Sequence, residues 1–173
     1  RLDFAAVRSA AEQQWEDALR VVEVEGGTQE QRTVFYTALY HLLIHPNILQ
    51  DVNGEYPMMG SLKTGKTQHD RYTVYSLWDT YRNVHPLLSL LYPRKQLAMV
   101  QTMLDMYKEG GWLPKWELYS QETMTMEGDP SIIVLNDTWQ RGIRDFDVQL
   151  AYEAMRKGAD TPGKANLLRP DND

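Results

Sequence analysis

Apolar residues recur every three or four positions along most of the chain, which is the period of an amphipathic α-helix. The first such stretch spans residues 7–22 and ends at two glycines. The second begins at Thr28, where Gln31 completes a capping-box pattern, and it stops at Pro46. A helix, a short glycine turn and a second helix predict an antiparallel hairpin.

The same period predicts four further helices. One begins at Ser76, with Asp79 as the reciprocal acid of a second capping box, and runs to about Leu91. Pro86 is expected to kink or restart it. Capping and stop residues predict three more: Pro93 to Gly110, Asp129 to Gly142, and Asp145 to Gly158.

Two long segments between these helices lack the helical period. Residues 48–75 are rich in Gly, Asn and Asp, and they end in the β-favouring run YTVY, which leaves room for one short hairpin. Residues 110–128 form the second segment. The chain therefore predicts an all-α fold of six helices in three hairpins. We expect both loops to lie at the same end, where function on helical scaffolds usually resides.

Composition removes several function classes. The 173 residues fit one ordinary domain. There is no cysteine, which excludes disulfides and thiolate zinc sites. The net charge is −6, and no run of Lys and Arg is longer than the pair Arg94–Lys95, so neither nucleic acid nor an anionic membrane is the expected partner. No apolar run is long enough to span a membrane.

Both ends of the sequence suggest a piece of a longer protein. The start, RLDFAAVRSAAEQQW, has no initiator Met and no signal-peptide pattern. Residues 159–173 are polar, carry two prolines and have no helical period. We expect one helical domain over residues 1–158, followed by a tail that is disordered or continues into a missing part.

The histidines give no firm metal site. His41 and His45 are four residues apart, a spacing that can chelate a metal, but no glutamate of an HExxH motif lies between them. An ordinary helix is the favoured interpretation. His69 and His85 stand alone in the sequence and predict no site.

One segment of the first loop offers oxygen ligands. Asp51, Asn53 and Glu55 lie close together in a pattern that could bind Ca²⁺, although the spacing is not that of an EF-hand. A plain turn is favoured, because the Asn-Gly pair supplies positive φ. No metal ligand is therefore assigned in this chain.

The second loop points to a sugar. Aromatic rings suit the CH face of a carbohydrate, and carboxylates and lysine suit its hydroxyl groups. Within eleven residues the loop holds such a set: Trp112, Lys115, Trp116, Glu117 and Glu122. Trp78 and Asp79 form a similar pair before it, although helix capping is the favoured explanation of Asp79 taken alone.

Four stretches together resemble glycoside hydrolase family 92: FYTALYHLLIHPNILQDVNGEY, YTVYSLWDTYRNVHPLL, GWLPKWELYSQETM and FDVQLAYEAM. They follow one unbroken order over residues 30–158. The resemblance implies a calcium-dependent, inverting exo-α-mannosidase, often specific for α-1,2 linkages, built on an (α/α)6 barrel. This chain resembles about the first half of that barrel. The pocket for the terminal mannose would include Trp78 and Asp79, lined or supported by Trp112, Lys115, Trp116, Glu117 and Glu122.

The resemblance also limits what this chain does alone. The family's acid, base and most Ca²⁺ ligands come from motifs without a counterpart here, so we expect this chain alone to be inactive. Were the acid present, Glu122 is the first candidate and Glu117 the second. The expected partners are a mannose-containing glycan and the rest of an exported parent polypeptide. Alternatives are a non-catalytic helical module that binds glycans or protein, or an (α/α)6 hydrolase of another sugar, trehalase-like or debranching-like.

Overall fold

The computed structural model describes residues 3–161, and the chain divides into two compact units, Arg1–Ile44 and His45–Asp173. Helices predominate, as predicted. In the described residues they are α1 (Phe4–Leu19), α2 (Gln29–Leu42), α3 (Leu77–Thr80), α4 (Val84–Leu91), α5 (Pro93–Gly110), α6 (Pro130–Gln140) and α7 (Val148–Asp160). The strands are β1 (Asn47–Ile48), β2 (Glu55–Pro57), β3 (Thr64–Lys66), β4 (Tyr72–Thr73), β5 (Tyr75–Ser76), β6 (Trp116–Leu118) and β7 (Gln121–Glu122).

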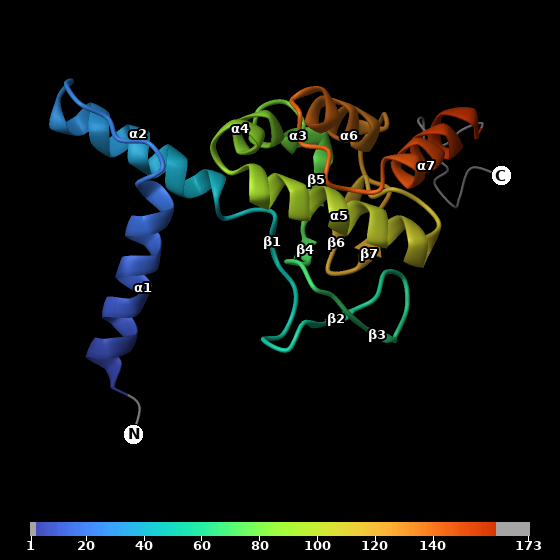
Figure 1. Ribbon diagram of the computed structural model, residues 1–173, viewed down its shortest axis with the longest axis horizontal. Coiled ribbons are helices and arrows are strands. Elements are labelled where there is room, and N and C mark those ends of the chain that lie inside the picture. Colours follow the sequence, from blue (N-terminus) through green and yellow to red (C-terminus); the bar gives the residue numbers. More distant parts are fainter. Residues whose placement is uncertain (1–2, 162–173) are drawn as a thin grey trace. The chain divides into compact units, whose positions relative to one another are not determined.

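The first unit is the predicted pair of helices. The capping box of Thr28 and Gln31 is confirmed, since both of its hydrogen bonds are present. The end of α1 lies against the second half of α2 (Figure 1), where the rings of Trp15 and Tyr40 are 4.6 Å apart. No residue of α1 is buried, so most of the apolar face that predicted the helix is exposed in the described structure.

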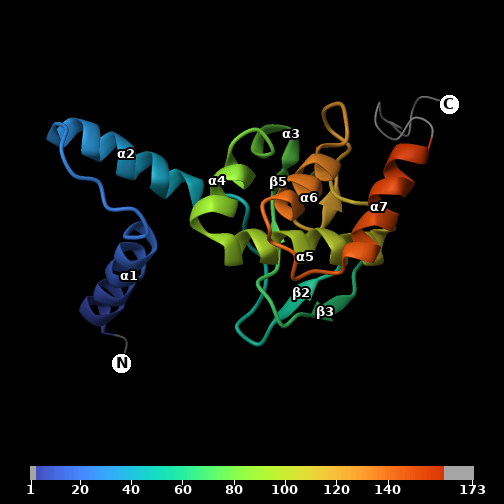
Figure 2. The same ribbon diagram turned by 45° about the horizontal axis from the view of Figure 1, so that its top comes forward.

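Helix α5 is the centre of the second unit. It packs against α4, α6 and α7, and the hairpin β2–β3 lies on the side of α5 away from α4 and α6 (Figures 1 and 2). Its predicted ends are confirmed: Pro93 is the first helical residue, and Gly111 closes the helix in the left-handed conformation at φ 80°. Its buried residues are Gln96, Ala98, Met99, Val100, Thr102, Met103, Leu104 and Met106.

Three small antiparallel sheets replace much of the irregular structure predicted for the loops. β1 pairs with β4, β2 with β3, and β5 with β6, which also pairs with β7. The short hairpin expected in the first loop is β2–β3. The hairpin β6–β7 in the second loop was not predicted. Strands of two or three residues are too short to show a period of two in the sequence.

The predicted helix from Ser76 to Leu91 is two helices. Ser76 makes no side-chain capping bond, so the second capping box is wrong. Helix α3 ends at Thr80, and α4 begins at Val84. Pro86 is the third residue of α4, where an amide N–H has no intrahelical acceptor, so the proline is accommodated in the first turn.

Two other helix starts differ in their caps. The last helix is capped by Asp147, which accepts from the N–H of Leu150 at 2.9 Å, and not by Asp145. Asp129 occupies the predicted N-cap position of α6 but makes no side-chain bond to the helix backbone. Its carboxylate instead accepts from the hydroxyl of Ser131 at 2.5 Å.

Gly158 does not end the last helix, contrary to the prediction. Helix α7 continues to Asp160, and Gly158 is buried within it. A Cβ atom at Gly158 would lie 2.6 Å from Oδ2 of Asp129, so the glycine permits close packing. Most of the predicted tail, residues 162–173, lies outside the described residues.

The two long loops contact each other directly, which confirms that they lie together. The N–H of Gly60 donates to the carbonyl oxygen of Ser120 at 2.8 Å, and the Ser120 hydroxyl donates to the carbonyl oxygen of Pro57 at 2.6 Å. The N–H of Tyr119 donates to the hydroxyl of Thr73 at 2.8 Å. These bonds place the second loop, which was predicted to bind a sugar, beside the first loop.

Candidate functional site

A three-stranded sheet brings the two predicted halves of the sugar site together. β5 pairs with β6, and the N–H of Leu77, just beyond β5, donates to the carbonyl oxygen of Lys115 at 3.2 Å. Trp78 and Asp79 are the next two residues. They therefore leave the sheet beside the KW segment of the second loop, although 37 positions separate Trp78 and Lys115 in the sequence.

Asp79 has a carboxylate available for a ligand. The residue is exposed, and its side chain forms no hydrogen bond or ion pair with any other residue in the range 3–161. The neighbouring Trp78 is half-buried, and the guanidinium of Arg82 lies 4.5 Å from its ring centroid. Arg82 also donates from Nε to the carbonyl oxygen of Trp78 at 3.2 Å, so it holds this ring in place.

Lys115 and Trp116 carry buried donors without an acceptor. Lys115 is 3% exposed, and neither its Nζ nor Nε1 of Trp116 has a hydrogen-bond partner among the described residues. Burial lowers the pKa of Lys115, while the carboxylates of Asp129, Glu122 and Glu127 oppose that shift. An unpaired buried donor costs free energy, so these two groups are the strongest sign of a missing ligand or chain segment.

Glu122 is bound to the backbone. One carboxylate oxygen accepts from the N–H of Lys115 at 2.7 Å, and the other accepts from Trp116 at 3.0 Å and Met124 at 2.9 Å. These three backbone N–H donors engage both carboxylate oxygens, so neither oxygen is left to face a substrate. The geometry therefore supports a positioning role for this first candidate acid.

Glu117 is fully buried between the two loops. Its Oε1 accepts from the Thr73 hydroxyl at 2.9 Å and from the N–H of Ser120, while Oε2 has no partner among the described residues. Burial raises the pKa of Glu117, and the bonds from Ser120 and Thr73 moderate the shift. This carboxyl connects the loops from inside, so it supports the proposed pocket and does not form its surface here.

Trp112 closes one end of α5. The ammonium of Lys157 lies 4.4 Å from the centroid of the Trp112 ring and donates to the carbonyl oxygen of Gly111 at 2.8 Å. Since Lys157 belongs to α7, this contact joins α7 to the end of α5. The ring thus has a structural contact on one face, and its role toward a sugar stays a prediction.

The acidic segment of the first loop is a turn. The carbonyl oxygen of Asp51 accepts from Gly54 at 2.9 Å, and the side-chain oxygen of Asn53 accepts from Glu55 at 3.0 Å. Gly54 has φ 85°, as expected for the Asn-Gly pair. Over residues 3–161, no group of three or more His, Cys, Asp or Glu residues could hold a metal ion.

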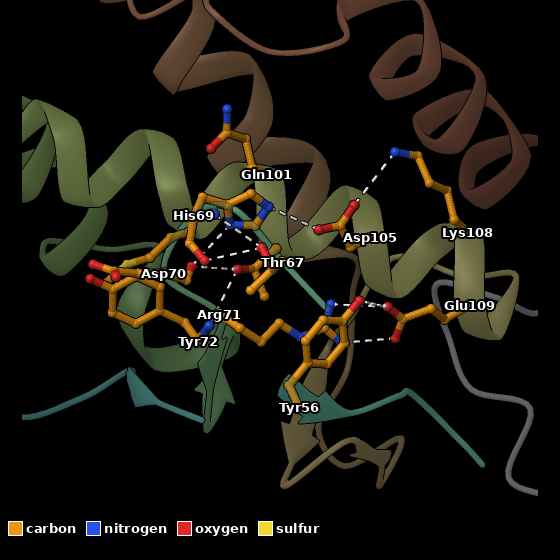
Figure 3. A network of polar contacts seen from close by, with 12 residues as sticks. Tyr56, Thr67, His69, Asp70, Arg71, Tyr72, Gln101, Asp105, Lys108 and Glu109 are labelled. Atoms are coloured by element: carbon orange, nitrogen blue, oxygen red, sulfur yellow. Dashed lines mark hydrogen bonds and ion pairs between the residues drawn. The ribbon is translucent and has the colours of Figure 1, made fainter. Parts of the chain in front are cut away.

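A buried ion pair that the sequence did not reveal supports the first loop (Figure 3). Arg71 is fully buried and pairs with Glu109 of α5 at 2.9 Å. Glu109 also accepts from the hydroxyl of Tyr56 and the N–H of Met59, both at 2.7 Å. These bonds attach β2 and its turn to the end of α5.

A pair formed by a histidine and an aspartate lies beside this cluster (Figure 3). His69 Nε2 is 2.9 Å from Oδ2 of Asp105, and Lys108 lies 3.4 Å from the other oxygen of that carboxylate. The hydrogen bond to Asp105 raises the pKa of His69 above its ordinary value. The pair is partly exposed and joins the irregular segment before β4 to α5.

Comparison with known families decides the identity of the chain. Residues 1–172 match the catalytic domain of glycosyl hydrolase family 92. The chain belongs to this family. The resemblance carried by WDTYR and GWLPKW is therefore confirmed, and the mostly helical fold agrees with part of the family 92 helical barrel.

Solved family 92 structures share this fold. The α-mannosidase BT3965 of Bacteroides thetaiotaomicron, in complex with mannoimidazole, is 34% identical, with a TM-score of 0.86 over 93% of this chain and 21% of its own. The inverting mannosidase BT2199 of the same organism is 34% identical, with a TM-score of 0.84 over 92% of this chain and 22% of its own. The chain thus spans about a fifth of these family 92 enzymes.

A fungal relative of this family 92 chain is named as an uncharacterized secreted glycosidase. This Arthroderma benhamiae protein is 30% identical over 162 residues, which are 91% of this chain and 16% of the relative. Across the described residues, no helix is long and apolar enough to cross a membrane.

Proposed function

We propose that the parent protein of this family 92 chain removes terminal α-linked mannose, chiefly α-1,2-linked, from glycans with inversion of configuration. Two relatives that are a third identical bear the names α-mannosidase and inverting mannosidase. Within the chain, one observation carries the proposal. The buried donors of Lys115 and Trp116 have no acceptor in residues 3–161, and the backbone of these two residues pairs with the segment that leads into Asp79.

These groups complement the hydroxyl groups and CH face of a sugar. An ammonium and an indole N–H can only donate hydrogen bonds, while an ionised carboxylate can only accept them. A sugar hydroxyl does both, so it can accept from Lys115 or Trp116 and donate to Asp79. The ring of Trp78 adds an apolar face for the CH groups. Convergence of these four side chains on one concave surface is part of the proposal.

This part of the enzyme binds and orients the substrate. An inverting glycosidase needs a carboxylic acid and a carboxylate base about 6.5–9.5 Å apart on opposite faces of the sugar. Glu122 is occupied by backbone donors and Glu117 is enclosed, so we assign both catalytic groups to the rest of the parent polypeptide. Orientation by this chain lowers the entropic part of the barrier.

The Ca²⁺ ion implied by the resemblance does not fit the described residues alone. Ca²⁺ requires six to eight oxygen ligands, whereas residues 3–161 hold no group of acidic and histidine side chains able to bind a metal. We therefore expect most ligands to come from the rest of the parent polypeptide. No step of the mechanism here depends on the ion.

We also expect the parent protein to be exported, where mannose-containing glycans and the remaining domains are its partners. The name of the fungal relative supports export. Detection of the parent protein in the periplasm or the medium of its source cells would test this point. Retention in the cytosol would contradict it.

The function is tested on the full-length parent protein with a panel of mannose disaccharides, with Ca²⁺ and after chelation. We expect release of mannose, fastest from the α-1,2 dimer, and loss of activity on chelation. Asp79→Asn and Lys115→Met should each lower kcat/KM about 10- to 150-fold, the value of a hydrogen bond to a charged group. Glu25→Gln, at an exposed position of the first unit, is the control.

Three results would contradict the proposal. Release of a different sugar would indicate another hydrolase specificity. Mannose binding without turnover would indicate a non-catalytic module. Unchanged kinetics in both variants would remove Asp79 and Lys115 from the site.

A further inference from the structure

The short helix that carries the sugar-binding candidates depends on tertiary contacts. α3 has four residues and no side-chain cap at its N-terminus, and a single helical turn is not stable by itself. Leu77 anchors one end, because it is fully buried and bonds to the carbonyl oxygen of Lys115. Thr80 anchors the other end, since its hydroxyl lies 2.9 Å from Nε2 of His85.

The bond of Thr80 belongs to a buried line of polar side chains from four helices. Nδ1 of His85 is 3.0 Å from Oε1 of Gln96, and Nε2 of Gln96 donates to the hydroxyl of Thr138 at 2.8 Å. The four residues come from α3, α4, α5 and α6, and all are buried. We name them the Thr80–Thr138 relay.

The direction of every hydrogen bond in the relay is fixed at one end. The Thr138 hydroxyl donates its proton to the carbonyl oxygen of Val134 at 2.7 Å, so its oxygen must accept from Nε2 of Gln96. Oε1 of Gln96 then accepts from Nδ1–H of His85. Nε2 of His85 is left as the acceptor for the hydroxyl of Thr80.

Burial keeps this arrangement in one state. It lowers the pKa of His85 to about 4, so the ring is neutral at ordinary pH and holds the Nδ1–H tautomer. Every side-chain nitrogen and oxygen of the relay has a hydrogen-bond partner, and fully satisfied buried networks are rigid. The relay therefore sets where Thr80 lies relative to α4, α5 and α6.

We propose that His85 is a positioning residue of the sugar site, which fixes the direction of Asp79 through Thr80. Thr80 immediately follows Asp79 in the single turn of α3, so a shift of one moves the other. The inference rests on the proposed function, in which Asp79 binds the sugar. Since a displacement of about 1 Å can reduce a rate about 100-fold, the relay is expected to matter for activity.

The test uses Thr80→Val in the full-length parent protein, because valine keeps the shape of threonine and removes the hydroxyl. We expect kcat/KM on an aryl α-mannoside to fall about tenfold or more. Thr80→Ser, which retains the hydroxyl, should restore activity to near wild type. The control is Thr102→Val, which removes a buried hydroxyl of α5 that bonds to the backbone of Asp70 and Tyr72 outside the relay.

Amide exchange supplies a readout that does not depend on mannosidase activity. Thr80→Val should speed exchange at Tyr81 and Arg82, whose N–H groups close the turn of α3, and Thr102→Val should not. Absence of turnover in the wild type would refute the proposed function. The exchange rates at Tyr81 and Arg82 would still show whether the relay holds α3 in place. Equal kinetics and equal exchange in the two valine variants would overturn the inference. If Thr80→Val does not fold, His85→Asn is compared with Thr102→Val by the same criteria.

Discussion

The carboxylate of Glu122 accepts a hydrogen bond from the backbone N–H of Lys115 at 2.7 Å. The side chain thus reaches back seven positions to the buried lysine that immediately precedes β6. With its bonds to Trp116 and Met124, it fixes the start of β6 and the turn after β7. Glu122 was the first candidate for the catalytic acid by sequence, but in the structure its carboxylate holds the backbone of neighbouring residues in place.

Replacing Glu122 by Gln should weaken these three hydrogen bonds to the backbone. The amide NH₂ of glutamine faces backbone donors and leaves at least one of them unpaired, which costs about 1–3 kcal/mol. We expect amide exchange at Lys115, Trp116 and Met124 to accelerate about 10- to 100-fold. Exchange measured in the parent protein checks this, with Glu25→Gln as the control. Unchanged protection would show that the three bonds do not hold the loop.

The pair of Arg71 and Glu109 should behave as a coupled buried ion pair. Arg71→Met or Glu109→Leu alone leaves an uncompensated buried charge and is expected to destabilise by about 3–5 kcal/mol. The double variant should lose much less than the sum of the single losses. Denaturant midpoints of the four proteins check the cycle, and additive losses would contradict it.

His69 should stabilise the fold mainly on the acid side of neutrality. The hydrogen bond to Asp105 raises the pKa of His69 above 6.5. The stabilisation that the protonated ring provides is therefore fully present below pH 6.5 and is lost as pH rises through the raised pKa. The destabilisation caused by His69→Gln should therefore be larger at pH 6 than at pH 8.5. Thermal unfolding at both pH values checks this. An equal effect at the two would mean that the charge of His69 contributes nothing.

His85 should have the opposite dependence. The unfolded chain binds a proton near pH 6.5, whereas burial lowers the pKa in the folded chain to about 4. The free energy of unfolding is therefore not reduced by this group above pH 6.5. It falls as the pH drops toward 4, by about 3 kcal/mol in total. His85→Asn should remove this part of the pH dependence even where it lowers stability overall. Denaturation curves between pH 4.5 and 7 check it, and an unchanged slope would contradict it.

The 173-residue chain alone should show no turnover. It spans about a fifth of the solved family 92 mannosidases, and we assign the acid and base to the remainder. Loss of the general acid alone reduces rates about 10²- to 10⁴-fold. The measurement uses an aryl α-mannoside and α-1,2-mannobiose with Ca²⁺. Turnover that disappears in Glu122→Gln would show the chain to be self-sufficient.

Helix ends with strong local signals could be predicted from the sequence. Pro93 and Gly111 bound α5, and Thr28 with Gln31 starts α2, because each signal acts within one turn of the helix. Gly158 was a misleading signal, since it resembles a stop but makes room for Asp129. A local pattern cannot distinguish a glycine that ends a helix from one required by a neighbouring helix.

The candidate site was found only in part for a similar reason. The residue types around Trp78 and Lys115 indicated a sugar, and the family resemblance connected the two segments. Neither revealed that Glu117 and Glu122 bond inward, because this depends on strands of two or three residues. Arg71 and Glu109 lie 38 positions apart, and nothing near either residue indicates its partner.

The bonds between the two long loops have a consequence for how the molecule folds. The Ser120 hydroxyl reaches Pro57 across 63 positions of chain, and Thr73 reaches Glu117 across 44. Closing such long loops costs conformational entropy before any contact compensates for it, whereas a helix such as α5 forms from local contacts. The side of this unit that we propose to bind a sugar is therefore assembled by its most non-local contacts. A chain with all its helices formed can still lack the surface that would hold a sugar.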